Sequence, residues 1–301
     1  MTLSILWFVL IAVLWTVYLI LEGFDFGVGM LLPFVAKGDP ERTQTVRTIG
    51  PHWDGNEVWL LTAGGATFAA FPEWYATMFS GMYLALFLIL VCLIIRVMAL
   101  EWRSKVATDK WRHAWDWAHT ISAWLVPILL GVAFANFVQG MRIEVVDVAT
   151  GTVIDPTLVD QSLASATHQL TGGFFSLLTP YTILGGLAVL AVCLAHGAQF
   201  LALKTTGEVR ERANAIAAPA TIGATVLAAA WLPTRRMSWR GSRSWLRRWR
   251  LLPRLPCRRP RCVMRAGPSR RPPLRLLARL RGSSRRWLPR FRSRRSTRRT
   301  R

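Results

Sequence analysis

Cysteine is scarce in this sequence, and lysine and acidic residues are missing from one end of it. The 301 residues include four cysteines, without a CxxC pair or a haem-attachment motif. This argues against a zinc site or a covalently bound haem. Cys92 and Cys193 lie in apolar stretches, where a cysteine is usually a small buried hydrophobe. A phosphate-binding glycine loop, a Ser/His/Asp arrangement and a nucleotide fingerprint are also missing, so nothing indicates a soluble catalytic domain.

Aspartate, glutamate and lysine are absent from residues 233–301, which contain 26 arginines. Residues 1–232 contain 12 basic and 16 acidic side chains, a net charge of −4. The formal charge of +22 therefore comes from the tail and predicts no nucleic-acid partner for the rest of the chain. We interpret 233–301 as a disordered, low-complexity tail. Two origins remain open: out-of-frame reading of a GC-rich gene, or a genuine basic tail that contacts anionic lipid or nucleic acid.

Long apolar runs dominate residues 1–232, and 52% of the whole sequence is hydrophobic. A helix needs about 20 apolar residues to cross a bilayer. The helices of a large soluble domain would each require a polar face, and the runs at 75–95 and 177–203 show almost none. The sequence therefore predicts an all-α, polytopic transmembrane helix bundle of about six spans, at 5–32, 55–71, 75–95, 118–138, 177–203 and 213–232.

The connections between these spans alternate in basic content. Three Lys or Arg residues follow the first span, five follow the third and three follow the fifth, whereas the second is followed by none and the fourth by one. Because basic loops stay in the cytoplasm, we expect the N-terminus to face outward. No Lys or Arg precedes Lys37, so the first span lacks the basic start of a signal peptide and is expected to stay in the membrane.

Two carboxylates lie inside the first span, where ionisable residues are costly and usually functional. Glu22 and Asp25 are three residues apart, so they share one helical face. Gly23, Gly27 and Gly29 remove side-chain bulk beside them, which allows another helix or a file of water to approach closely.

A second polar group begins the next span on the same side of the membrane. Asp54 and Glu57 are its acids, and the group also contains His52, Trp53, Asn56 and Trp59. Acids and an imidazole that converge at one mouth of the bundle suit a proton entry route. The alternative is that Asp54 and Glu57 form a capping box at a helix N-terminus, where carboxylates are favourable. Capping does not explain Asp25 or Asn56.

Three other polar residues give weaker signals. His119 and His196 could be imagined as axial haem ligands, but a lone membrane histidine more often bonds to a neighbouring group. Arg96 ends the third predicted span, where snorkelling to the surface is the ordinary interpretation. We predict no haem, other cofactor or metal bound by this chain.

Two strings of residues resemble a known family. They are GFDFGVGML at 23–31 and PHWDGNEVWL at 51–60, followed by TAGGATFAAFPEWYA at 62–76 and a WRHAWDW segment. In this order they resemble subunit II of the cytochrome bd-type quinol oxidases, and the resemblance covers residues 1–232. That subunit has eight spanning helices, whereas this chain offers six followed by the basic tail.

The resemblance implies a membrane enzyme that oxidises quinol and reduces dioxygen to water. Subunit I would carry the b- and d-type haems, and subunit II would assemble with it and line a proton path from the cytoplasm. The acids of the two motifs, here Asp25 and Asp54, would relay protons. Glu22, His52, Trp53, Asn56, Glu57 and Trp59 would shape the route and the helix start. The expected partners are subunit I, membrane lipid and quinone.

The alternative from a different functional class is a proton-coupled secondary transporter that uses intramembrane carboxylates. It would show interrupted helices at corresponding positions of two inverted halves. The sequence shows no such pair.

Overall fold

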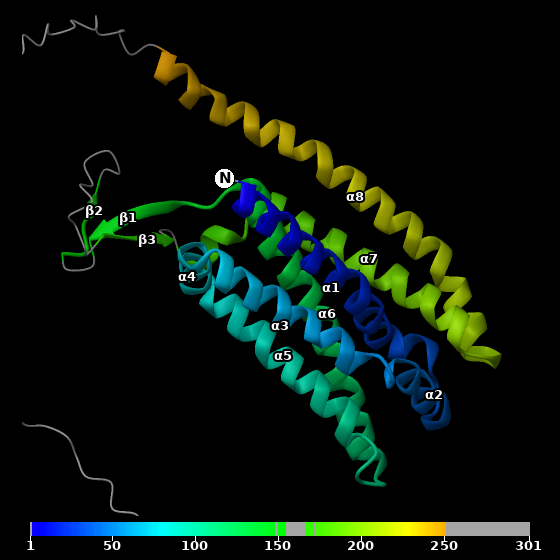
Figure 1. The fold of residues 1–301 in the computed structure, drawn as a ribbon. Helices are drawn as coiled ribbons and strands as arrows, with labels where there is room; N and C mark the ends of the chain where they lie inside the picture. The colour runs from blue at the N-terminus through cyan, green and yellow to red at the C-terminus, as the bar shows by residue number, and fades with distance from the viewer. Residues whose placement is uncertain (1, 148–149, 155–165, 171–172, 251–301) are drawn as a thin grey trace, which may run out of the picture. The chain divides into compact units, whose positions relative to one another are not determined.

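The computed structural model describes the backbone of residues 2–147, 150–154, 166–170 and 173–250, and side chains as far as Leu232. Helices dominate this part of the chain (Figure 1). They are α1 (Thr2–Val35), α2 (Asp39–Ile49), α3 (Trp53–Ala70), α4 (Pro72–Gly81), α5 (Tyr83–Trp102), α6 (Asp109–Gln139), α7 (Pro180–Lys204) and α8 (Gly207–Arg250). The predicted all-α membrane bundle is therefore confirmed.

Among the described residues, five helices are long and apolar enough to cross a membrane: α1, α5, α6, α7 and the 207–232 part of α8. The predicted span at 55–71 corresponds to α3, which has 18 residues and is not among these five. At 1.5 Å per residue it is about 27 Å long, slightly less than the hydrocarbon thickness. It packs along α1 within the same bundle.

The third span begins later in the chain than the sequence predicts. The apolar run from 75 to 95 is divided between α4, which ends at Gly81, and α5, which starts at Tyr83. The predicted span is wrong by about two helical turns, because a short helix consumes the first part of the run. Arg96 therefore lies inside α5 instead of at its end.

Two connections contain structure that the sequence analysis treats as loops. The first is α2, a polar helix that buries Thr45 and Ile49. The second is the connection between α6 and α7, which contains β1 (Ile143–Asp147), β2 (Val153–Ile154), β3 (Ala166–Leu170) and the 3-10 turn η1 (Phe174–Leu177). β1 is the central strand and pairs antiparallel with both others, with Ile143 opposite Leu170 in β3.

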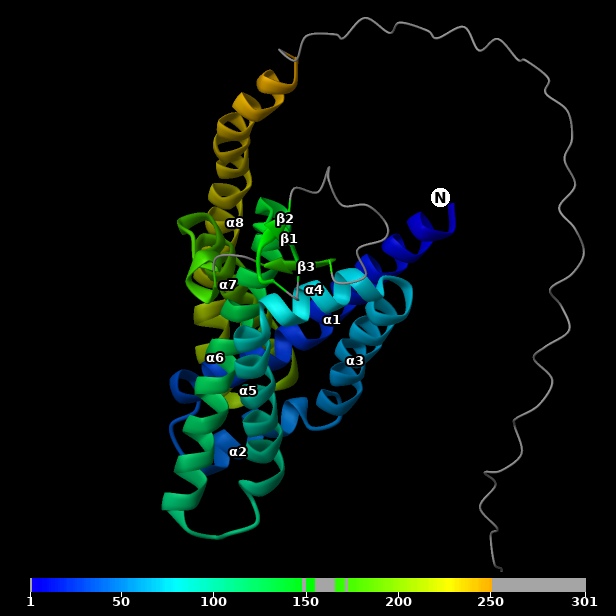
Figure 2. The ribbon, with the colours of Figure 1, turned by 90° about the vertical axis from the view of Figure 1, so that its left-hand side faces the viewer.

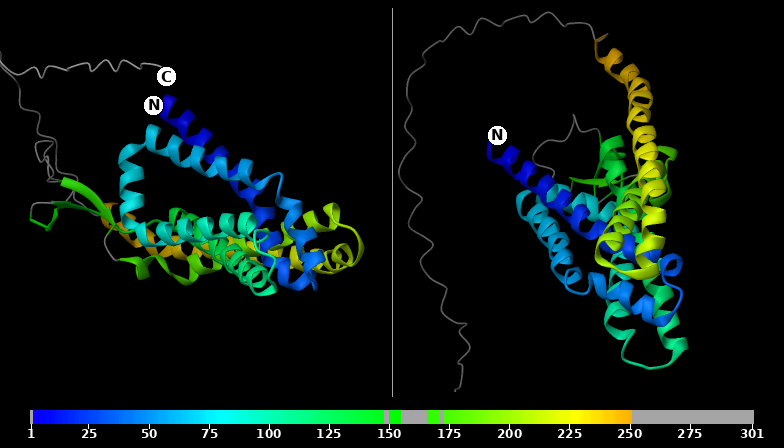
Figure 3. Two further views of the ribbon diagram at one scale, coloured as in Figure 1. Left: turned by 90° about the horizontal axis from the view of Figure 1, so that it is seen from below. Right: turned by 90° about the vertical axis from the view of Figure 1, so that its right-hand side faces the viewer.

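The long helices run between two opposite ends of the bundle. The N-terminus, α4 and the small sheet lie at one end, and α2 lies at the other with the α5–α6 and α7–α8 turns (Figures 1 and 2). α8 runs along α7, which in turn packs on α1 and α6 (Figure 3). α8 continues to Arg250, so its backbone is helical beyond Leu232. The boundary at Leu232 stays a prediction, and 251–301 lie outside the described residues.

Candidate functional site

A stripe of polar side chains runs along one buried face of α1. Tyr18, Glu22 and Asp25 are all fully buried. Their spacing of four and then three residues places them on one helical face. Both acids face Arg96 of α5, which confirms that they lie on one face, and the packing of α1 against α3, α6 and α7 explains their burial.

Arg96 of α5 is the counterion of this stripe. Its Nη1 donates to Glu22 Oε1 and to Glu57 Oε1, the latter at 3.1 Å. Its Nη2 lies 3.9 Å from Asp25 Oδ2. The guanidinium carbon lies 4.7 Å from the centre of the Phe26 ring, a cation–π contact. One guanidinium therefore faces three carboxylates in a site where the Arg96 side chain is fully buried.

This charge count has a chemical consequence. If Glu22, Asp25 and Glu57 were all ionised, the four side chains would carry a net charge of −2. Uncompensated charge is costly away from water, so a buried site with several carboxylates favours binding a proton. The cluster is therefore suited to take up and release protons.

The sequence-based interpretation of Arg96 as a snorkelling residue is wrong. It followed from placing the end of the span at residue 95, whereas α5 continues to Trp102. The structure also places the partner of Glu22 in this same chain. An arginine inside an apolar run, matched with acids inside another, is the signal that could have identified the pair.

Asn56 joins α3 to this site. Its side-chain amide donates to Asp25 Oδ2 at 2.7 Å and to the Leu21 carbonyl oxygen at 3.3 Å. The next residue, Glu57, is partly buried, with 18% of its side chain exposed. Asn56 of the second polar group thus bonds to an acid of the first, and Glu57 bonds to the arginine that the acids of the first group face.

Asp54 lies outside this cluster. It is exposed at the start of α3, and the residue before that helix is His52, which makes no side-chain capping bond. The capping-box interpretation is therefore not supported by the geometry. Asp54 and Glu57 are three residues apart, so both lie on the side of α3 that leads to Arg96.

The remaining predicted site residues surround this entrance. His52 is exposed and makes edge contacts with Phe24 and Phe200, both with ring centres 6.4 Å away. Trp53 is half-buried at the first position of α3. Trp59 packs against the apolar core between α1, α5, α6 and α7. None of these three bonds to an acid of the cluster among the described contacts.

The two histidines considered as haem ligands have different surroundings. His119 of α6 is 2% exposed, and neither of its ring nitrogens has a hydrogen-bond partner, contrary to the expectation of a bond to a neighbour. His196 of α7 is half-buried against Phe24, with ring centres 5.6 Å apart. Within the described residues, no group of three or more His, Cys, Asp or Glu side chains is arranged to hold a metal ion.

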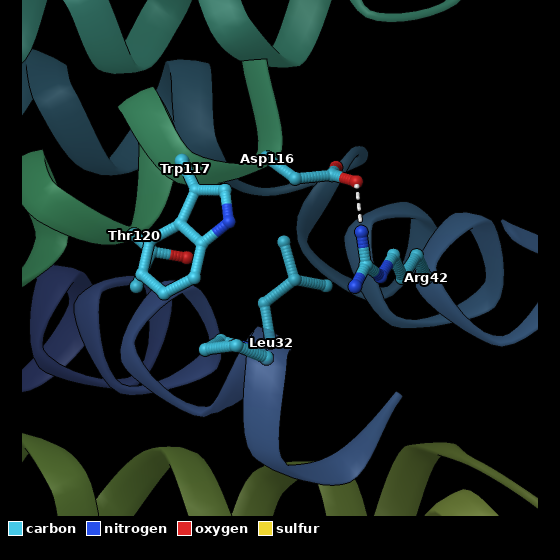
Figure 4. A pocket seen from close by; sticks show the side chains of 6 residues that line it. Leu32, Arg42, Asp116, Trp117 and Thr120 are labelled. Atoms are coloured by element: carbon cyan, nitrogen blue, oxygen red, sulfur yellow. Dashed lines mark hydrogen bonds and ion pairs between the residues drawn. The ribbon is translucent and has the colours of Figure 1, made fainter. Parts of the chain in front are cut away.

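A second ionic network lies at the α2 end of the bundle. Arg103 binds Asp116 Oδ1 at 2.5 Å and Asp39 Oδ1 at 2.7 Å. Arg42 of α2 reaches the other oxygen of Asp116 at 3.1 Å, beside Leu32, Trp117 and Thr120 (Figure 4). From the sequence, Arg42 and Arg103 were predicted only as basic residues of two connections. They tie α2 to α5 and α6, which fixes the connection that leads into α3.

Glu41 extends this anchoring to α8. Its carboxylate accepts from the Lys37 backbone N–H at 2.8 Å and from Arg212 at 2.7 Å. The backbone bond from Lys37, and then Arg212, hold the pKa of Glu41 below its usual range. Arg212 also donates to the Val35 carbonyl oxygen at 2.8 Å, so the last turn of α1 is bound as well.

Replacing Arg103 with leucine should lower the free energy of unfolding by about 3 kcal/mol, because the buried Asp116 loses its nearer partner. Denaturant unfolding in detergent would measure this. Arg47→Leu is the matched control, since Arg47 is exposed on α2, and we expect its effect to stay below about 0.5 kcal/mol. Equal effects of the two substitutions would contradict an anchoring role for Arg103.

Comparisons with known proteins place this chain in a family. The family model for "Cytochrome bd terminal oxidase subunit II" matches residues 3–271. The cytochrome bd-I ubiquinol oxidase subunit 2 of Escherichia coli (strain K12) is 40% identical over 233 residues, covering 76% of this chain and 57% of that protein. The cytochrome bd ubiquinol oxidase subunit 2 of Bacillus subtilis (strain 168) is 41% identical over 212 residues, covering 70% of this chain and 56% of that protein.

The matched relatives indicate where this chain is located and how much of their length it shares. Five helices long enough to span, together with bacterial relatives, indicate a multi-pass protein of a bacterial cytoplasmic membrane. The chain spans between half and two thirds of the length of these curated relatives. The match to the family model continues past Leu232 into the Arg-rich segment. This chain belongs to the cytochrome bd terminal oxidase subunit II family.

Proposed function

We propose that this chain is the non-haem subunit II of a cytochrome bd-type quinol oxidase. It assembles with a haem-bearing subunit I, and the complex reduces dioxygen to water with quinol as the electron donor. Reduction of dioxygen to water consumes protons, so such a complex needs a route that supplies them. The observation that carries the proposal is the buried cluster of Glu22, Asp25, Glu57 and Arg96, found in a chain of this family.

The route begins at the exposed Asp54 and ends at the buried Asp25. Between them lies Glu57, whose side chain is partly exposed and bonds to Arg96. Solvent exposure falls from Asp54 to Glu57 to Asp25. A proton therefore moves from solvent through Glu57 to the Arg96 cluster. Asn56 fixes Asp25 at the inner end through its 2.7 Å bond. His52, Trp53 and Trp59 shape the entrance and the start of α3.

This route opens on the cytoplasmic side in the proposed orientation. Asp54 lies at the start of α3, which directly follows α2, the helix at the end of the bundle opposite the N-terminus (Figure 1). The basic residues of α2, of the α5–α6 turn and of the start of α8, including Arg47, Lys105 and Arg210, belong to this end. Basic residues favour the cytoplasmic side, so the N-terminus faces outward.

The substitution Asp54→Asn should slow oxygen reduction by the assembled oxidase by about tenfold or more, because the amide cannot pass a proton. Haem content, measured by visible absorption, should stay unchanged. Oxygen consumption with a quinol donor measures the rate. The matched control is Glu73→Gln, because Glu73 is an exposed acid in α4 at the opposite end of the bundle.

Unaltered turnover of Asp54→Asn would remove Asp54 from the proton route. Copurification tests the broader proposal separately. If a haem-bearing subunit copurifies with this chain, detected by the visible absorption of its haem, the chain belongs to an oxidase. A chain that purifies without haem and moves a solute with protons would be a transporter.

A further inference from the structure

The ionic network at the α2 end of the bundle carries one surplus positive charge. Arg112 joins this network through its Nη1, which lies 2.6 Å from Asp39 Oδ2. Arg42, Arg103 and Arg112 thus share two carboxylates, those of Asp39 and Asp116, which gives +3 − 2 = +1. Each oxygen of the two aspartates already faces an arginine. The network therefore attracts a further anion.

Arg42 keeps free hydrogen-bond donors at the surface of this network. Its Nη1 lies 3.1 Å from Asp116 Oδ2 and 3.2 Å from His113 Nδ1, and its Nη2 has no partner among the described contacts. Trp117 Nε1 lies 3.1 Å from the other ring nitrogen of His113. A neutral imidazole accepts at only one nitrogen, and a charged one at neither. Arg42 and Trp117 therefore cannot both donate to His113, and at least one of them has a further donor for a ligand.

These donors line a small pocket between the end of α1, α2 and α6. Figure 4 shows Arg42, Trp117 and the hydroxyl of Thr120 around it, with Leu32 between them. The pocket has a volume of about 10 Å³, which is room for one water-sized group. A larger ligand must therefore lie at the mouth of the pocket, with a single oxygen atom inside.

An apolar stripe on α6 begins at this pocket and leads away from the charges. Trp117, Ile121 and Leu125 are spaced by four residues, so they share one face of the helix. Their exposed fractions are 48%, 54% and 37%. The stripe rises by about 12 Å along a helix long and apolar enough to span the membrane. A hydrocarbon chain fits such a surface, whereas a free inorganic anion has no use for it.

We propose that Arg42, Trp117 and Thr120 bind the phosphate of an anionic phospholipid. One of its acyl chains lies along Trp117, Ile121 and Leu125. A phosphodiester carries one negative charge, which balances the surplus charge of the network. A zwitterionic lipid brings its own ammonium group, so the anionic lipid is favoured. Tryptophan is typical of the headgroup level, and basic pockets between helices recognise anionic headgroups on the cytoplasmic side. That leaflet rests on the orientation proposed above.

Arg42→Leu tests the phosphate contact. The purified membrane complex that contains the full-length chain is titrated with phosphatidylglycerol, and native mass spectrometry counts the bound lipids. Arg42→Leu should weaken the binding of one phosphatidylglycerol by about tenfold, because a charge-assisted hydrogen bond is lost. The matched control is Arg47→Leu, which removes the same charge from an exposed position on the same helix and should leave this binding unchanged. Equal effects of the two substitutions would overturn the site.

Trp117→Phe is the second variant, because it removes the indole N–H and keeps an apolar ring at the start of the stripe. It should weaken binding by about threefold, even if Arg42→Leu does not assemble. Trp74→Phe is its control, since Trp74 is an exposed tryptophan of α4 at the opposite end of the bundle. If Arg42→Leu does not assemble, equal binding by the two tryptophan variants would overturn the site.

Two further ligands identify the class of molecule bound. Inorganic phosphate should not displace the lipid, because it lacks the acyl chain, and phosphatidylethanolamine should bind more weakly than phosphatidylglycerol. Displacement by phosphate, or equal binding of the two lipids, would overturn the assignment to an anionic phospholipid. Asp54→Asn should bind phosphatidylglycerol as the unmodified protein does. The lipid site can therefore fail while the proposed proton route stands, and the reverse.

Discussion

Replacing Arg96 with leucine should lower the free energy of unfolding by about 3–5 kcal/mol, the largest loss expected from any single substitution at the site. Arg96 is fully buried and is the shared cation for Glu22, Asp25 and Glu57. Without it, the carboxylates would have to bind protons or draw water into the bundle. Denaturant unfolding in detergent would measure the loss, and the amount of haem that copurifies would report assembly.

Three variants define the cause of that loss. Arg96→Lys should be intermediate, since it keeps the charge but loses the planar group that serves several acids. Combining Arg96→Leu with Glu22→Leu should recover part of the stability, because it removes one of the unpaired acids. Arg142→Leu is the matched control, since Arg142 is exposed, and its effect should stay below about 0.5 kcal/mol. A loss no larger than that of the control would show that Arg96 does not hold the acids together.

Gly27→Ala should destabilise the bundle by about 3 kcal/mol, because α1 and α7 meet there backbone to backbone. A Cβ atom on Gly27 would overlap the Cys193 carbonyl oxygen and lie 2.6 Å from the Gly197 Cα atom. Gly197 is equally restricted, since its Cβ would lie 2.6 Å from the Val28 nitrogen. Backbone atoms cannot rotate aside, so the helices would have to separate, which would also move the nearby Asp25.

Gly23→Ala provides the comparison one turn away on α1. There the added Cβ would meet His196 Nδ1 at 3.5 Å and Cys193 Sγ at 3.7 Å, which are ordinary contacts. Alanine is also the better helix former, so this change should be neutral or stabilising by up to about 1 kcal/mol. Similar losses at the two positions, measured by the same unfolding experiment, would contradict close approach at Gly27 as the cause.

The prediction from sequence succeeded where the membrane itself imposes the pattern. Apolar runs of about 20 residues become helices because lipid leaves no other way to satisfy the backbone. The glycines beside Asp25 were predicted to allow close approach, and Gly27 and Gly29 do so against α7 and α6. The prediction from sequence failed at the boundaries of helices. The run from 75 to 95 gives no sign that Gly81 ends one helix and Tyr83 begins another.

That boundary error concealed the centre of the site. With the span ended at residue 95, Arg96 was assigned to the surface, and Glu22 was left without a partner. The pair joins residues 74 positions apart, so the contact itself depends on how α1 and α5 pack, although an arginine within an apolar run was a signal of such a partner. His119 was likewise seen only as a lone histidine, because its position over Gly29 depends on how α6 packs against α1.

The sequence by itself determined that this protein is a bundle of membrane helices, that Glu22 and Asp25 share a face, and which family it belongs to. These features depend on hydrophobicity, helical periodicity and short motifs, all of which are local. Only the tertiary structure decided that Arg96 neutralises those acids, that Asp54 stays exposed while Glu57 reaches inward, and that His119 lies over Gly29. Those relations depend on the rotation and depth of each helix, which packing between helices fixes.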